Sequence, residues 1–395
     1  MASPDVLEFA KLLAPISPEN PTGVDPRVDP SPNSPYFTIK DDRRKAIEME
    51  RPTADGSPDW HVVRELGLKI LTEKAKDLGI AVFLTEALAR LEGFAGMRDG
   101  FRLSREFVEK FWDGLYPLPD KADMEREKAL KANPNLSPDE KEELKSISEE
   151  CRSTRIAPIV GLNGHDAEGT LLAPIARIPL TGMTDIGQFT FAHYNEGKSL
   201  KKITDAKLLQ QKVDEGKVTL EKFQKAVAES EPAFYVKLVD DINGSLTELT
   251  KLGAALDQRC DGRGPPISAI KARITECLDV VKEVAKEKLR VATPAKPETE
   301  PAKDGAAPAA PGQPKPQPGV IQTREQALES LMKVADFFRR TEPHSPISYT
   351  LDQVVRWGRM PLPELWAELL GEEARKSVFK QVGIRAEEAK APPKK

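Results

Sequence analysis

The residues that could carry out catalysis or bind a metal ion are few and scattered along the chain. The sequence has four histidines and three cysteines among 395 residues, and it contains no C-x-x-C, P-loop, G-x-G-x-x-G, H-E-x-x-H or G-x-S-x-G motif. His165 and Asp166 could form half of a catalytic pair, but no nucleophile or metal ligand stands at a useful spacing from them. The sequence therefore predicts a protein that is not an enzyme and that has no cofactor and no metal site.

The other histidines and the cysteines fit structural positions. His61 stands at an expected helix start, His193 lies between aromatic residues, and His344 follows Pro343 in an expected turn. Cys277 falls on the apolar face of an expected helix, which places its thiol in the core. Because the three cysteines cannot all pair with one another, the sequence favours the reducing cytosol.

The charge balance argues against several classes of partner. The chain has 59 basic and 63 acidic residues, so its net charge of −4 gives no single-signed field that would attract DNA or an anionic membrane. The lysine-rich run at 198–202 has acidic residues close by and no stacking aromatics, which favours a solvated face. No run of about 18 apolar residues occurs, and the first residues lack the pattern of a signal peptide. We expect a cytoplasmic protein with no nucleic-acid partner and no membrane insertion.

The first element that must position any functional side chain is a helical N-terminal domain, expected over residues 1–135. Ser3 is expected to cap a short first helix, and the proline-rich chain that follows is expected to wrap the surface as an extended segment up to Trp60. Apolar residues at three- and four-residue spacing then predict three helices from Asp59 to about Asp113. Short turns with glycine join them, which is typical of a helical bundle.

A helical middle domain is expected over residues 136–292. Ser137, Pro138 and Glu140 have the spacing of a capping box with proline in the first turn. Proline interrupts the apolar residues between 155 and 195, so extended pieces and broken helix both fit that stretch. Two longer helical patterns, at about 232–260 and 266–291, predict an antiparallel hairpin closed by a turn with glycine and proline.

The last quarter of the chain divides into three parts. Residues 293–320 are rich in proline and alanine and predict an extended, flexible linker. Residues 321–385 predict a small helical module, whose core is marginal at this size, so burial against identical copies would stabilise it. Residues 386–395 are expected to be a disordered tail. The predicted fold is therefore mainly α, with an N-terminal bundle, a helical middle region, a linker and a C-terminal oligomerisation module.

Two sets of sequence fragments, at opposite ends of the chain, resemble one known family. The N-terminal set has the order and spacing of the ImpA N-terminal domain, which marks the TssA proteins of bacterial type VI secretion systems. It consists of LAPI at 13–16, Pro21 with Gly23 and Asp25, Tyr36, Trp60, KDL at 76–78, GFAG at 93–96 and FWDGLYP at 111–117. The C-terminal set, FFRRTEPHSPISY at 337–349 and VRWGRMP at 355–361, is similar to the C-terminal module of the shorter TssA members.

This resemblance implies a non-enzymatic assembly factor. Proteins of the family help to organise the baseplate, the contractile sheath and the inner tube of the secretion apparatus, and they form ring-shaped homo-oligomers through the C-terminal region. The resemblance therefore implies that this chain binds itself and other apparatus proteins on the cytoplasmic side. A ring that carries arms on flexible linkers would turn one oligomerisation event into several tethered contacts.

Candidate contact residues follow from the matching motifs. In the N-terminal set they are Trp60, Lys76, Asp77, Trp112 and Tyr116, which could instead hold the helical bundle together. In the C-terminal set tryptophan, arginine and methionine are types enriched at interface cores, and packing within the module is the alternative. These candidates for subunit contact are Arg356, Trp357, Arg359, Met360 and Trp366.

Two other functions stay open at the level of sequence. The protein could be a monomeric helical adaptor that binds another cytoplasmic protein, which light scattering would reveal. It could also be an enzyme with an unrecognised site around His165 and Asp166, which would require turnover that is lost on His165→Ala. Neither the copy number of a ring nor the apparatus protein that is contacted follows from the sequence.

Overall fold

The computed structural model describes residues 2–51, 56–165, 168–292, 324–341, 347–360 and 365. Within these ranges the chain is helical, with only isolated β-bridges between extended residues, so the predicted mainly α fold is confirmed. The chain separates into two compact units, Met1–Thr299 and Glu300–Lys395. The predicted linker, the predicted tail and Trp366 lie outside the described residues.

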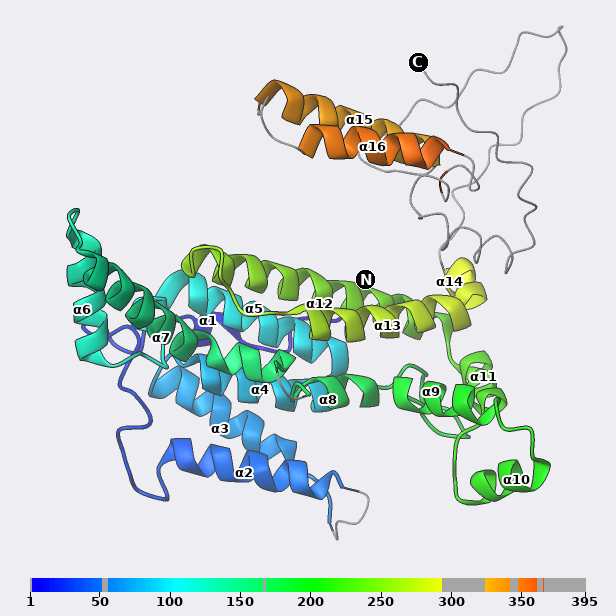
Figure 1. The fold of residues 1–395 in the computed structure, drawn as a ribbon. Coiled ribbons are helices and arrows are strands. Elements are labelled where there is room, and N and C mark those ends of the chain that lie inside the picture. Colours follow the sequence, from blue (N-terminus) through cyan, green and yellow to red (C-terminus); the bar gives the residue numbers. More distant parts are fainter. Residues whose placement is uncertain are drawn as a thin grey trace, which may run out of the picture. The chain divides into compact units, whose positions relative to one another are not determined.

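The first unit contains fourteen described helices (Figure 1). In chain order they are α1 (Phe9–Leu12), α2 (Pro35–Met49), α3 (Trp60–Glu73), α4 (Leu78–Leu91), α5 (Gly93–Phe111), α6 (Lys121–Ala132), α7 (Pro138–Asn163), α8 (Leu172–Arg177), α9 (Phe191–Leu200), α10 (Ala206–Asp214), α11 (Leu220–Glu229), α12 (Pro232–Arg259), α13 (Ser268–Val284) and α14 (Lys286–Ala292). The described part of the second unit is a pair of packed helices, α15 (Arg324–Thr341) and α16 (Ile347–Arg359).

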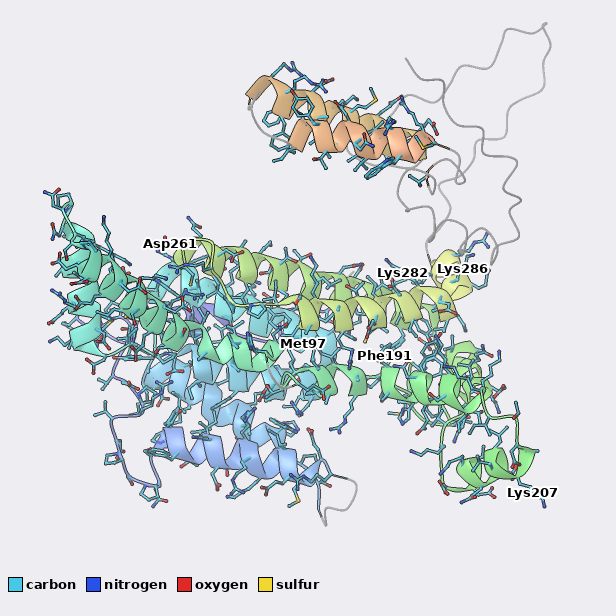
Figure 2. All side chains as sticks on the ribbon, viewed as in Figure 1. Met97, Phe191, Lys207, Asp261, Lys282 and Lys286 are labelled. Carbon is cyan, nitrogen blue, oxygen red and sulfur yellow. The ribbon has the colours of Figure 1, made fainter. Side chains whose placement is uncertain are left out.

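The core of the first unit forms around α4, α5 and α12. Helix α5 packs against α4 on one side and against α12 on the other, and Met97 of α5 is fully buried between them (Figure 2). Ser245 of α12 donates a hydrogen bond of 2.6 Å to the carbonyl of Phe94. Helices from both predicted domains contribute to one hydrophobic cluster. The predicted boundary between residues 1–135 and 136–292 stays a prediction.

The chain before Trp60 differs in part from the expected wrapping segment. Helix α2 begins at Pro35, whose fixed φ suits the first helical position, and Ser34 caps it. Arg43 of α2 forms an ion pair with the buried Glu86 of α4. The proline-rich pattern concealed this helix because most of its face is polar, with only Ile39 and Ala46 fully buried.

The predicted helix cap at Ser3 is also wrong. The first described helix starts at Phe9, and Ser3 instead donates its backbone N–H to the Asp241 carboxylate at 2.8 Å. Asp99 of α5 accepts the backbone N–H of Val6 at 2.6 Å. The N-terminal residues are therefore held by carboxylates of α5 and α12, a contact between residues far apart in sequence that no local pattern reveals.

The structure shows which elements form residues 155–195 of the middle region, where the sequence had left two alternatives. Helix α7 begins with the predicted capping box of Ser137 and Glu140 and continues through Pro158 to Asn163. Residues 155–195 contain both helical and extended pieces. Helix α8 is short, and Pro179 pairs with Thr190 in an isolated β-bridge. No helix in the described ranges is both long and apolar enough to cross a bilayer.

Candidate interaction sites

Three segments that are distant in sequence meet beside the start of α4. Gly23 pairs with Ala75 and Asp77 pairs with Tyr116, each as an isolated β-bridge. The backbone N–H of Lys76 donates to the carbonyl of Thr22 at 2.8 Å, while its carbonyl accepts the N–H of Tyr116 at 3.0 Å. Short backbone contacts thus join the motifs around 21–25, 76–78 and 111–117, and we call this assembly the motif cluster.

Gly23 is required by the geometry of the motif cluster. Its φ is +74°, a conformation that residues with a side chain rarely adopt. A Cβ at this position would lie 2.0 Å from the carbonyl oxygen of Lys74. Only glycine lets the first segment approach the chain before α4 so closely.

Lys76 is a fully buried cation at the centre of the motif cluster. Its ammonium donates hydrogen bonds of 2.8 Å to the carbonyls of Leu12 and Leu71, and it lies 5.8 Å from the ring centres of Phe107 and Phe111. Burial lowers the pKa of Lys76 to about 8. In this position Lys76 ties the end of α1 and the end of α3 to the aromatic face of α5.

Asp77 has a different environment from its neighbour. Its carboxylate caps α4 by accepting the backbone N–H of Ile80 at 2.9 Å, and it accepts a hydrogen bond of 2.7 Å from Arg27. Burial opposes the charge of Arg27, but the carboxylates of Asp77 and Asp25 outweigh burial and raise the pKa of Arg27 above its ordinary value. Lys76 and Asp77 have no exposed surface, so direct partner contact would require the cluster to open.

Among the aromatic candidates of the N-terminal unit, the two tryptophans lie against arginines and the tyrosine bonds to a backbone carbonyl. The indole N–H of Trp60 donates to Glu50 at 2.8 Å, and the Arg90 guanidinium lies 3.8 Å from the Trp60 ring centre. Arg155 lies 4.9 Å from the Trp112 ring centre. The hydroxyl of Tyr116 donates to the carbonyl of Gly23 at 3.2 Å. Trp60 is buried, whereas Trp112 and Tyr116 are half-buried and reach the surface.

Sequence reasoning missed a groove that contains Trp60. It has a volume of about 1040 Å³, and its lining combines the ends of α2 and α4 with α8 and α12. Arg177 from α8 donates to Glu50 at 2.8 Å and joins the network of Trp60 and Arg90. The signal in the sequence was Trp60, because apart from Met49, Glu50 and Pro58 the other lining residues are about 30 to 180 positions away in the chain.

The C-terminal candidates lie on the hairpin of α15 and α16. Arg356 and Arg359 are exposed, while Trp357 and Met360 are half-buried. Leu328 of α15 packs against Gly358, where a Cβ would lie 2.6 Å from a Leu328 methyl carbon. Large apolar side chains are also exposed on this hairpin, at Met332, Val334, Phe337, Ile347, Tyr349 and Val354.

Comparisons with known proteins place the motif cluster within a family match. Residues 13–164 match the family described as ImpA, N-terminal, type VI secretion system, and the matched range contains the whole motif cluster. Over 123 residues the chain is 32% identical to the type VI secretion system component TssA1 of Pseudomonas aeruginosa. Residues 13–164 are thus an ImpA N-terminal region of the type VI secretion kind. That alignment spans 30% of this chain and 34% of TssA1, so it covers about a third of the relative's length.

The fold of the first unit also has a solved counterpart. It is the N-terminal domain of the TssA component of the type VI secretion system from Burkholderia cenocepacia, which includes the conserved ImpA_N region. The TM-score is 0.55 and the identity 21%, and the likeness covers 73% of this chain and 98% of the solved domain. At this identity the likeness shows a shared fold. The C-terminal hairpin of this chain lies outside the family match.

The cysteines and His193, whose side chains could in principle react or bind a metal ion, lie in structural surroundings. Cys151, Cys260 and Cys277 are buried thiols without disulfides, and burial raises the pKa of Cys277 to about 12. His193 accepts the backbone N–H of Thr190 at 3.1 Å in a helix cap. Asp166 and His344 lie outside the described residues, and within those residues no cluster of three potential metal ligands occurs.

Proposed function

We propose that this protein is a TssA-type assembly component of a type VI secretion system and that it binds to copies of itself through the hairpin of α15 and α16. The observation that supports self-association is the exposure of six large apolar side chains on this hairpin. The much larger first unit exposes seven in its described residues, so exposed apolar surface is concentrated on the second unit. Surface of this kind is typical of a protein interface.

In this proposal the oligomer is a ring, and the first unit binds other proteins of the apparatus. Self-association would remove the apolar face of the hairpin from water and would stabilise a module with few buried residues of its own. Each ring would present several copies of the first unit to baseplate, sheath or inner-tube proteins. Arg356, Trp357, Arg359 and Met360 are the proposed contact residues, and Trp366 stays a candidate from sequence.

The test compares two substitutions of phenylalanines that are exposed in the described structure. Phe337→Ser removes a side chain of α15 that is 56% exposed, and Phe37→Ser removes one of α2 that is 37% exposed. We expect the unchanged protein to form an oligomer in light scattering at micromolar concentration. Phe337→Ser is expected to weaken this association at least about tenfold, since removal of an interface hot spot costs about 2 kcal/mol or more and tenfold corresponds to about 1.4 kcal/mol. Phe37→Ser serves as the matched control and should leave the oligomer intact.

A monomeric unchanged protein would contradict the proposal and would favour the adaptor function. Equal loss of the oligomer in both variants would also contradict it, because the contact would then not depend on the hairpin. Circular dichroism of both variants should retain the helical signal of the unchanged chain, which separates loss of contact from loss of fold.

A further inference from the structure

A small basic pocket lies at one end of the first unit, where it borders the motif cluster at Trp112. It has a volume of about 150 Å³, below the range of about 300–1,000 Å³ that is usual for larger ligands. Helices α6 and α7, the end of α5 and the turn after α12 meet there, and Asp261 marks that turn in Figure 2. The pocket is thus built from segments as far apart in the chain as Trp112 and Arg263.

Positive charge dominates the lining of this pocket. It has five basic side chains, Lys131, Arg152, Arg155, Arg259 and Arg263, and two acidic ones, Glu127 and Asp261. Glu127 pairs with Lys131 at 2.6 Å. Outside the lining, Glu149 pairs with Arg152 and lies 3.6 Å from Arg263.

Two arginines of the pocket have only uncharged hydrogen-bond partners among the described residues. Arg155 donates to the carbonyl of Trp112 at 2.6 Å and contacts the Met124 sulfur at 3.8 Å. Arg259 donates to the carbonyl of Glu109 at 2.8 Å. Burial lowers the pKa of Arg155 and outweighs the opposing effect of the nearby Asp113 and Glu127 carboxylates. Its charge is therefore held in a poorly solvated place without a hydrogen-bonded carboxylate among the described residues.

The arginines of this pocket also have hydrogen-bond donors without a partner. The Nε–H of Arg152 is buried and has no hydrogen-bond partner in the structure. A guanidinium has five N–H donors, so the single carbonyl bonds of Arg155 and Arg259 leave most of their donors available. The carbonyl bonds of Arg155 and Arg259 also stabilise the C-terminal end of α5, and Arg152 donates to the carbonyl of Arg263 in the turn after α12. These bonds alone leave the buried Arg152 Nε–H donor and the surplus charge unexplained.

We propose that this pocket binds a phosphate-type oxyanion through Arg152, Arg155 and Arg259. Guanidinium groups that approach from α7 and from the end of α12 suit the several oxygens of a tetrahedral anion, whereas one arginine suffices for a carboxylate. The anion would link α7 to α12 and the end of α5. This site goes beyond the proposed assembly role and does not depend on self-association.

The probe is inorganic phosphate, titrated into the full chain by calorimetry with ionic strength held constant by chloride. We expect one saturable site, and we expect Arg155→Gln and Arg259→Gln each to weaken binding at least about tenfold, as for the loss of a charge-assisted hydrogen bond. Arg44→Gln removes an exposed arginine of α2 and should bind phosphate as the unchanged chain does. Because Arg259 is exposed, its variant should keep the fold even if the Arg155 variant does not.

Two further ligands identify the chemistry that the pocket accepts. O-phosphoserine tests whether the phosphate can be esterified, and its binding or exclusion separates a modified partner from a free anion. Acetate at the same ionic strength should not compete with phosphate. Absence of saturable phosphate binding tighter than about 10 mM would overturn the proposal, as would equal binding by the Arg259→Gln variant or equal competition by acetate.

Discussion

At the scale of single residues, two neighbours in the motif cluster show how the surroundings set a charge's role. Lys76 and Asp77 are adjacent and both fully buried. Asp77 has a cationic partner in Arg27, whereas the partners of Lys76 are two carbonyls and two aromatic rings. Carbonyls and rings favour the ammonium, but less than water does, so burial prevails and lowers the pKa of Lys76.

The buried ammonium predicts a specific pH dependence of stability. In the native state Lys76 releases its proton near pH 8, while in the unfolded chain an ordinary lysine holds it until about pH 10.4. Between these values the unfolded state binds more protons, so the free energy of unfolding rises with pH. Urea unfolding of the unchanged protein and of Lys76→Met should therefore diverge across this window, by up to about 3 kcal/mol in favour of the unchanged protein.

Other titrating groups are common to both proteins and cancel in this difference. Lys74→Met is the control, because it removes an exposed lysine two positions away. Its stability should follow the unchanged protein in parallel at every pH. Parallel curves for Lys76→Met as well would show that Lys76 keeps its ordinary titration and would contradict the prediction.

At the scale of elements, the position of α5 between α4 and α12 depends on small residues. Gly100 of α5 faces Thr85 of α4, and a Cβ on Gly100 would lie 2.4 Å from the Thr85 hydroxyl oxygen. Thr85 is fully buried and donates to the carbonyl of Ala81 at 2.7 Å, so it has little room to move. The close approach of these two helices is therefore set at Gly100.

Two glycine substitutions separate packing from helix propensity. Gly161 of α7 has nothing within 4 Å of its Cβ position, so Gly161→Ala should stabilise the protein by up to about 1 kcal/mol through helix propensity alone. Gly100→Ala has the same propensity gain but must displace α4 or Thr85, and we expect a net loss of about 1–2 kcal/mol. Urea unfolding measures both, and a stabilised Gly100→Ala variant would show that α4 and α5 can separate without cost.

At the scale of the whole molecule, the two units have different degrees of self-sufficiency. The main hydrophobic cluster lies wholly within the first unit and includes residues from Leu7 to Ala285. The described part of the second unit buries few apolar side chains, chiefly Leu328, Ala335 and Val355. A large closed core can fold alone, whereas two short helices gain stability from further burial.

Removal of residues 321–395 tests this difference. The truncated chain should retain a cooperative unfolding transition and the circular dichroism expected of α1 to α14, because its core is complete. It should no longer form the oligomer of the full chain in size-exclusion chromatography with light scattering. A truncated chain of unchanged oligomeric size would contradict the role assigned to the hairpin.

The sequence by itself determined the features that depend on neighbours along the chain. The capping box of Ser137, the helices after Asp59 and the hairpin of α12 and α13 follow from spacings of three or four residues. It also indicated the family through short motifs whose order the family match confirms within residues 13–164. The sequence analysis did not predict helix α2, because the helix begins with a proline and its mostly polar surface gives a weak apolar periodicity.

Only the tertiary structure decided which distant residues meet. Thr22, Lys76 and Tyr116 are joined by backbone hydrogen bonds across more than 90 positions, and Arg155 and Arg259 line one pocket across more than 100. Helix formation depends on contacts within a turn, whereas these meetings depend on the path of the whole chain around α4, α5 and α12. Lysine and arginine side chains could each cap a helix, bind a partner or pack in the core. Which of these each side chain does depends on the neighbours that the fold brings to it.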